Sequence, residues 1–209
     1  MEKQILSAYK NANMFFDPND SRFVAWENSL MQSERWEALY KIGNLSHSSV
    51  LDIGCGVGDI IPHLKDNFSD VDYFGIDINP QMIAVAKGKY PKEHFLQRNF
   101  FDDDWPLSPI QNRWDWIVAS GAFSVKLNED DHHIVLAMNK MATLCNKGVA
   151  FNFLSTKTKH KDKMLHYYDE EKVFSYAKRK WPNCRLVSNY LSEDPESDQT
   201  LYIYMTTGL

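Results

Sequence analysis

Short apolar runs alternate along the chain with longer segments whose apolar positions recur every three or four residues. The short runs predict strands over residues 49–53, 72–78, 94–97, 114–119, 148–154, 185–190 and 200–205. The longer segments predict helices over residues 26–42, 59–67, 129–144 and 170–181, with further helices over 2–11 and from Pro80 onward. We expect Asn79 and Asn128 to cap two of these helices. This alternation is typical of a mostly parallel sheet covered by helices on both faces, and the last two strands predict a hairpin at one edge.

A glycine-rich turn follows the first predicted strand. The segment reads VLDIGCGVGD from Val50 to Asp59, and it places glycines at 54, 56 and 58 between an apolar strand and a helix. Glycine fits where the backbone turns tightly and approaches a ligand, and the start of a helix presents free N–H groups. A dinucleotide-binding turn of the type G-x-G-x-x-G would need glycine at position 59, where the chain has Asp59.

Two carboxylates flank this turn. Asp52 stands two residues before the first glycine, where it would repel a pyrophosphate but would suit a ligand with an ammonium group, such as the methionine end of S-adenosylmethionine (SAM). Asp77 ends the second predicted strand, 19 residues after Gly58, where an acid accepts hydrogen bonds from ribose hydroxyls. Together, the two acids and the glycines predict a nucleoside ligand with a cationic tail.

The ordered motifs of the chain resemble those of the class I SAM-dependent methyltransferases. They read DIGCGVGD, GIDINPQMIAVAK, FLQRNFFD, WDWIVASGAFSV and LCNKGVAFNF, and the resemblance covers about residues 45–155. It implies a single Rossmann-like, doubly wound α/β domain with a seven-stranded, mostly parallel sheet whose last strand runs antiparallel. SAM would lie over the carboxyl ends of the first three strands, and S-adenosylhomocysteine (SAH) would be the product. A small bacterial-type enzyme that acts on small molecules is the expected member.

The resemblance also implies roles for residues around the glycine turn. Asp52 and Gly54 would face the methionine moiety of SAM, while Cys55 and Gly56 would pass beneath the ligand. Asp77 would hold the ribose. A nucleophilic role for Cys55 is disfavoured, because no His or Asn stands near it in the sequence, and a close-packed small residue is the expected alternative.

The same resemblance extends the cofactor site to the adenine and to the fourth strand. The expected contacts are Ile78 and Met82 at the adenine, Asn99, Phe100 and Phe101 after the third strand, and Ser120 and Gly121 near the methionine end. Many members of the family carry an acid after the third strand, which meets the adenine amino group. Here only Asp102 is close enough in sequence to reach back, and the alternative is that Phe100 stacks on the ring.

The single domain, 1–209, is expected to have three parts: an N-terminal helical cover segment (1–45), a SAM-binding core (46–155), and an acceptor-side part with a loop, a helix and the closing hairpin (156–209). Family members often place a substrate cover at the N-terminus, and plain packing is the alternative for the aromatic residues Tyr9, Phe15, Phe16, Phe23 and Trp26. A long polar loop after the fifth strand carries His166, which is the candidate base for an acceptor that needs one.

Composition narrows the partners. The chain has 28 acidic and 23 basic residues, a net charge of −5, and no basic stripe of the kind that grips nucleic acid. A small-molecule acceptor is therefore favoured. The three cysteines lie far apart, and neither they nor the histidines form a metal-binding pattern. Without a secretory signal or an apolar run near ~20 residues, we expect a cytoplasmic protein with no membrane association, either a monomer or a homodimer.

The leading hypothesis is in-line transfer of the SAM methyl group to an oxygen or nitrogen atom of a small-molecule acceptor. The residues after the fourth strand read ASGAF from Ala119, not the Asn/Asp-Pro-Pro-aromatic signature of many DNA and protein amide N-methyltransferases. One alternative is a non-catalytic SAM-binding protein of the same fold that serves as a regulatory or partner subunit. A weaker alternative is an NAD-type dehydrogenase, since an acid about 20 residues after the glycine turn is shared with NAD enzymes.

Overall fold

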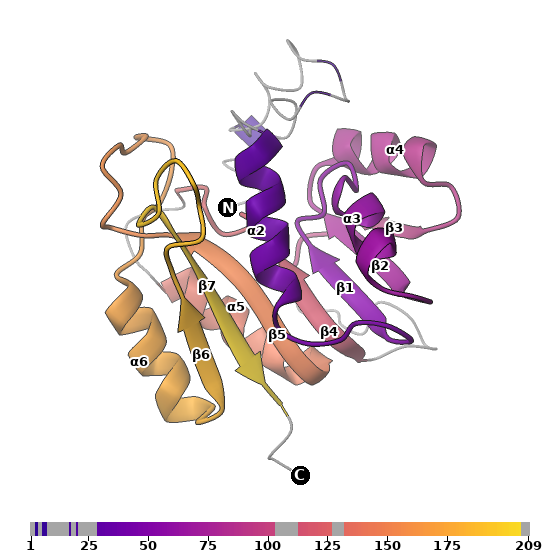
Figure 1. Ribbon diagram of the computed structural model, residues 1–209. Coiled ribbons are helices and arrows are strands. Elements are labelled where there is room, and N and C mark those ends of the chain that lie inside the picture. Colours follow the sequence, from indigo (N-terminus) through magenta and orange to yellow (C-terminus); the bar gives the residue numbers. More distant parts are fainter. Residues whose placement is uncertain are drawn as a thin grey trace.

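The computed structural model describes residues 3, 6–7, 17, 20, 29–102, 113–126 and 132–205. These residues form one seven-stranded sheet in the order β3-β2-β1-β4-β5-β7-β6 (Figure 1). The strands are β1 (Ser49–Ile53), β2 (Asp72–Asp77), β3 (His94–Gln97), β4 (Trp114–Ala119), β5 (Cys145–Leu154), β6 (Cys184–Val187) and β7 (Asp198–Tyr204). β1 to β5 run parallel, whereas β7 is antiparallel to both β5 and β6. The expected fold class, including the closing hairpin, is confirmed.

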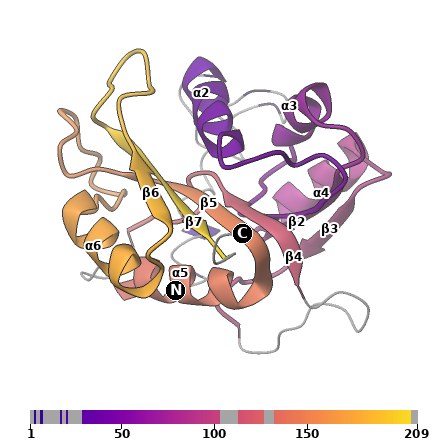
Figure 2. The same cartoon turned by 60° about the horizontal axis from the view of Figure 1, so that its bottom comes forward.

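Helices cover both faces of this sheet, as expected. They are α2 (Ser29–Tyr40), α3 (Ile60–Asn67), α4 (Pro80–Lys89), α5 (His132–Leu144) and α6 (Glu170–Lys180). Helices α2, α3 and α4 lie on one face, and α5 and α6 lie on the other (Figures 1 and 2). Among the described residues, no helix is both long and apolar enough to cross a bilayer.

Each central strand supplies side chains to two separate apolar layers. In β1, Val50 packs with the α2, α3 and α4 layer, while Leu51 packs with the α5 and α6 layer. In β4, Trp116 and Ile117 divide in the same way. Successive side chains of a strand point to opposite faces, so a strand buried on both sides is mostly apolar. This explains why these strands appear as mostly apolar runs in the sequence.

Several element boundaries differ from those expected. The helix expected over 26–42 is described from Ser29 and ends at Tyr40, and β5 begins at Cys145 because α5 ends at Leu144 with no loop between them. β7 begins at Asp198 because this residue still pairs with Leu154. β6 covers only 184–187, since Val187 is its last residue paired with β7. Of the helix expected over 2–11, the structure describes residues 3, 6 and 7, and these three are helical. The cap at Asn128 and the N-terminal aromatic residues lie outside the described residues.

The helix after β2 begins as expected. The side chain of Asn79 accepts a hydrogen bond from the backbone N–H of Gln81 at 2.9 Å, and Pro80 occupies the first helical position. This cap satisfies one of the N–H groups that the first turn of a helix leaves without an intrahelical acceptor. It thereby fixes where α4 starts relative to the end of β2, which is the edge that carries Asp77.

Gly148 of β5 provides a test of how tightly the α2-side layer is packed. A Cβ added at this position would lie 2.9 Å from Cζ3 of Trp116 and 3.2 Å from the carbonyl oxygen of Ile203. Overpacking a core costs about 1–3 kcal/mol, so we expect Gly148→Ala to lower the free energy of unfolding by that amount in urea titrations. Gly88 of α4 is the matched control, because a Cβ there would meet nothing within 4 Å. Gly88→Ala should stabilise the helix by about 0.5–1 kcal/mol. If both substitutions changed the free energy of unfolding equally, the tight packing around Gly148 would be contradicted.

Candidate active site

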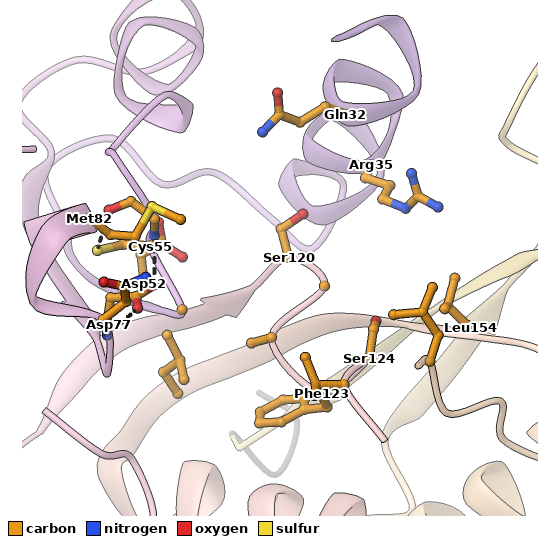
Figure 3. A pocket seen from close by; sticks show the side chains of 18 of the residues that line it. Gln32, Arg35, Asp52, Cys55, Asp77, Met82, Ser120, Phe123, Ser124 and Leu154 are labelled. Atoms are coloured by element: carbon orange, nitrogen blue, oxygen red, sulfur yellow. Dashed lines mark hydrogen bonds between the residues drawn. The ribbon is translucent and has the colours of Figure 1, made fainter. Parts of the chain in front are cut away.

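A cavity of about 910 Å³ lies over the carboxyl ends of the parallel strands and extends to helix α2 (Figure 3). The structure brings all of the expected cofactor residues to its lining: Asp52, Gly54, Cys55, Gly56, Asp77, Ile78, Met82, Asn99, Phe100, Phe101, Ser120 and Gly121. They come from the ends of four strands, except Met82, which lies in α4. In a parallel sheet these ends share one edge, and ligands of open α/β folds bind in the crevice at that edge.

The glycine turn is held against the end of β2. The backbone N–H groups of Gly54 and Cys55 both donate to the carbonyl oxygen of Ile76, at 2.8 and 3.0 Å. Gly54 has a φ of +72°, and a Cβ there would lie 2.7 Å from the Cβ of Ala122. Only glycine meets both the backbone conformation and the close approach. The turn therefore lies directly against the segment that follows β4.

Cys55 fills the space beneath this turn. A Cβ added at Gly75 of β2 would come within 2.9 Å of the Cys55 Sγ, so the thiol packs directly on the strand. Burial raises the pKa of the Cys55 thiol well above its ordinary value, and the nearby carboxylates of Asp77 and Asp52 raise it further. The thiol is therefore protonated at neutral pH, which agrees with a packing role and not with a nucleophile.

Asp77 connects the glycine turn with the start of α4. Its Oδ2 accepts a hydrogen bond from the backbone N–H of Gly56 at 2.9 Å, and its Oδ1 accepts one from the backbone N–H of Asn79 at 2.8 Å. Burial raises the pKa of Asp77, while these backbone N–H groups act in the opposite direction. The carboxylate is thus held in one orientation at the cavity wall.

Asp52 is the more deeply buried of the two acids, with 3% of its side chain exposed. The hydroxyl of Tyr73 donates to its Oδ2 at 2.7 Å. Burial is the main reason that the pKa of Asp52 is raised to about 7, with the hydrogen bond from Tyr73 opposing the rise and the charge of Asp77 adding to it. The expected anion is therefore balanced between its two protonation states at neutral pH, and a neighbouring cation would favour the ionised form.

Aromatic rings form the part of the cavity that follows β3. The rings of Phe100 and Phe101 lie 5.4 Å apart, and both lie 6.4 Å from the ring of Phe123. Asp102 does not line the cavity. Its Oδ1 instead accepts a hydrogen bond from Nδ2 of Asn99 at 3.1 Å, so it does not reach back toward the site. Within the described part of this segment, residues 99–102, no acid lines the cavity.

Comparisons with known proteins agree with this geometry. A family described as "Methyltransferase domain" matches residues 51–151. The protein Rv1506c of Mycobacterium tuberculosis, named as a methyltransferase, is 30% identical over 140 residues, which are 64% of this chain and 80% of that protein. The chain belongs to the class I SAM-dependent methyltransferases. SAM is therefore its cofactor and SAH its product, and the dehydrogenase alternative is wrong.

Two further likenesses come from more distant proteins. The trans-aconitate 2-methyltransferase of Rhodopseudomonas palustris is 25% identical over 83 residues, which are 40% of this methyltransferase and 32% of that enzyme. The crystal structure of magnesium protoporphyrin IX methyltransferase from Synechocystis, with bound SAM, has 14% identity and a TM-score of 0.66, and the match covers 99% of this chain and 98% of that one. At this identity the structural likeness shows a shared fold.

His166, the candidate base, is not brought to the cavity of this methyltransferase. Its ring packs against Tyr168 and His133, with centroids 4.5 and 5.5 Å away, and its backbone N–H donates to the carbonyl oxygen of Ser124. The polar loop that carries His166 does reach the site, through the lining residues Thr158, His160, Lys161, Asp162, Met164, Leu165 and Tyr167. The loop thus lines the cavity, while the ring of His166 lies in a neighbouring aromatic cluster.

Asn152 is a residue that sequence reasoning missed. It is fully buried in β5 of the methyltransferase, and its Oδ1 accepts a hydrogen bond from the backbone N–H of Gly121 at 2.7 Å. Gly121 has a φ of +67°, so this bond fixes the sharp turn after β4. A polar residue inside the apolar run 148–154 was the available signal, because a buried amide needs a partner.

Two residues of α2 were also missed. Gln32 and Arg35 are buried, with 7% and 3% of each exposed, and both line the cavity opposite the glycine turn (Figure 3). Arg35 forms an ion pair with Asp198 of β7. No local pattern links these two residues, which are 163 positions apart.

Asp52 generates a prediction about stability. Because its folded-state pKa of about 7 exceeds the ordinary value of 3.8, the folded methyltransferase binds this proton more tightly than the unfolded chain. Its stability therefore falls as the pH rises through that interval. Asn at position 52 can still accept from Tyr73 but carries no charge. One pKa unit corresponds to about 1.4 kcal/mol, and the pKa of Asp52 rises from 3.8 to about 7. We therefore expect Asp52→Asn to raise the free energy of unfolding at pH 8 by an amount with an upper limit of about 4 kcal/mol, measured without cofactor.

The pH dependence separates this explanation from a simple packing effect. At pH 5 the folded form of Asp52 is already protonated, so the stabilisation by Asp52→Asn should be smaller there than at pH 8. A gain of equal size at both pH values would show that the charge of Asp52 is not its source.

Proposed function

We propose that this methyltransferase transfers the methyl group of SAM to an oxygen or nitrogen atom of a small-molecule acceptor by in-line displacement. The observation that carries the proposal is the cavity, which joins the expected cofactor residues to a second wall built by other segments. That second wall comes from α2, from residues 154–167 and from the turn at 193–197. The cavity volume of about 910 Å³ falls within the range of small-molecule sites.

The proposed SAM position follows from the two carboxylates and the turn between them. The ribose hydroxyls would donate to Asp77, whose carboxylate is already oriented by Gly56 and Asn79. The ammonium group of the methionine moiety would face Asp52, where it would favour the ionised carboxylate. The adenine would lie among Ile78, Met82 and the residues 99–101. The sulfonium would then lie over the end of β4, near Ser120 and Gly121.

Transfer at this position requires little chemistry from the protein. A lone pair of the acceptor attacks the methyl carbon, the bond between that carbon and sulfur breaks, and its electron pair stays on sulfur to give neutral SAH. Catalysis of such a step rests mainly on proximity and orientation. An ionised acid or a neutral amine needs no base in order to attack, which suits a site that does not include His166.

The three-part division of the chain is retained as part of this proposal. Residues 46–155 carry the proposed SAM contacts, and residues 156–209 supply part of the proposed acceptor wall, including His160, Tyr167 and Asp194. The described portion of the segment 1–45 supplies α2, which lines the same cavity with Gln32 and Arg35. The net charge of −5 supports a small acceptor over a nucleic acid.

A combined binding and turnover experiment tests the reaction. SAM binding is measured by calorimetry, and the release of SAH is then followed with panels of small carboxylic acids, phenols and amines. We expect SAM to bind and at least one panel to raise SAH release above the rate of spontaneous hydrolysis. Tight binding of SAM without turnover on any panel would favour the non-catalytic partner role instead.

Asp77 tests the proposed position of the ribose. We expect Asp77→Ala to weaken SAM binding by about 1–3 kcal/mol, because charge-assisted hydrogen bonds to the ribose are lost. Calorimetry with SAM measures the change, and Asp115→Ala is a control at a carboxylate outside the cavity lining. If Asp77→Ala bound SAM as tightly as the unchanged protein, the ribose would have to lie elsewhere.

A further inference from the structure

The α2 wall of the cavity carries a buried positive charge. Arg35 is the one Lys or Arg, among the described residues, whose side chain is buried, with 3% exposed. Gln32 lies one helical turn earlier on the same helix and is also buried. Both residues line the cavity, on the side opposite Asp52 and Asp77 (Figure 3). A guanidinium is thus placed in the part of the cavity that the proposed SAM position leaves to the acceptor.

Arg35 is held in place by a chain of polar groups from the last part of the fold. Its Nε donates to Oδ2 of Asp198, and its Nη1 donates to the carbonyl oxygen of Met31 at 3.4 Å. The hydroxyl of Tyr190 donates to Oδ1 of Asp198 at 2.6 Å, and Oγ1 of Thr200 donates to the Tyr190 oxygen at 2.9 Å. Each partner is fixed by the next, so the guanidinium plane has a defined orientation.

Stability alone is a poor explanation for this arrangement. Removing two charges from water often costs more than their attraction returns, and well-packed apolar residues frequently do as well or better in such places. Burial raises the pKa of Asp198, and the positive charge of Arg35 acts in the opposite direction. A buried ion pair in the wall of a ligand cavity is better explained by recognition, because arginine matches the planar geometry of a carboxylate.

A second polar group lies between the α2 wall and the sheet. The hydroxyl oxygen of Ser120 is buried and has no hydrogen-bond partner among the described residues. Figure 3 shows this hydroxyl pointing from the end of β4 toward α2, where Gln32 and Arg35 lie. A buried hydroxyl without a partner costs free energy, so an acceptor oxygen at this place would satisfy it.

We propose that the acceptor carries a carboxylate, which Arg35 binds at the α2 wall with Gln32 and Ser120 as further donors. This inference rests on the proposed function, since it assigns the acceptor class of the same site.

A carboxylate is favoured over a phosphate dianion because an acidic turn lies beside α2. The backbone N–H of Ser192 donates to Oε2 of Glu34 at 3.2 Å, and Glu193 and Asp194 of this turn line the cavity. The carboxylates of Glu193 and Asp194 would oppose the second negative charge of a phosphate dianion.

The test measures binding of carboxylate probes to the methyltransferase already saturated with SAH. The probes are benzoate, 3-phenylpropionate and trans-aconitate, and benzamide and 3-phenylpropionamide are their uncharged counterparts. Calorimetry follows each titration. The principal variant is Arg35→Met combined with Asp198→Asn, which removes the guanidinium without leaving a buried charge unpaired. Arg35→Lys retains the charge but not the planar fork, and Arg185→Met removes an exposed arginine that does not line the cavity.

We expect at least one carboxylate probe to bind the SAH complex while its amide does not. The double variant should bind that probe at least tenfold more weakly but keep its SAH affinity within about twofold. Arg35→Lys should be intermediate, and Arg185→Met should be unchanged. If the double variant does not bind SAH, the Arg35→Lys variant provides the test. It must then weaken binding of the carboxylate probe without weakening binding of SAH.

Two results would overturn the inference: no carboxylate binds the SAH complex, or the Arg35 variants bind the probe as tightly as the unchanged protein. Failure of the proposed function is recognised separately, because the unchanged protein would then not bind SAH before any probe is added.

Discussion

The site depends on the placement of two carboxyl groups at the wall of the cavity. Asp52 and Asp77 stand on adjacent parallel strands, and β1 and β2 pair so that Asp52 lies beside Gly75. Among the residues that the structure describes, no lysine or arginine forms an ion pair with either carboxylate. The phenol of Tyr73 and two backbone N–H groups stabilise them instead. Such partners lower the cost of burial without cancelling the charge, and the electrostatic attraction that remains is what a cationic nucleoside would meet.

The sequence was most informative where function and local geometry coincide. The glycine turn is contiguous in the chain, and its backbone conformation demands glycine whatever the rest of the fold does, as the φ of Gly54 shows. The parallel strands are buried on both faces, so their apolar runs were visible without knowledge of the partners. Asn79 capped α4 as expected because a cap is a local interaction. These features placed all of the expected cofactor residues on one cavity.

Contacts between distant parts of the chain could not be predicted from the sequence pattern. The pair Arg35 and Asp198 links α2 to β7, and the bond from Gly121 to Asn152 links the ends of two strands. Neither contact has a spacing rule. His166 illustrates a different limit, because the direction of its ring depends on packing against Tyr168 and His133. Side-chain direction in a loop is set by tertiary contacts, which one sequence does not specify.

The link between α2 and β7 affects the order in which the two walls of the cavity form during synthesis. β7 inserts between β5 and β6, close to the end of the described chain, whereas α2 precedes the first strand. During synthesis, the glycine turn and the carboxylates can assemble early, but Arg35 acquires its anchor only after Asp198 has emerged. Contacts of such sequence separation form slowly, because a long loop must close first. Nascent chains would thus complete the nucleoside half of the crevice first, and its opposite wall only after β7 has been synthesised.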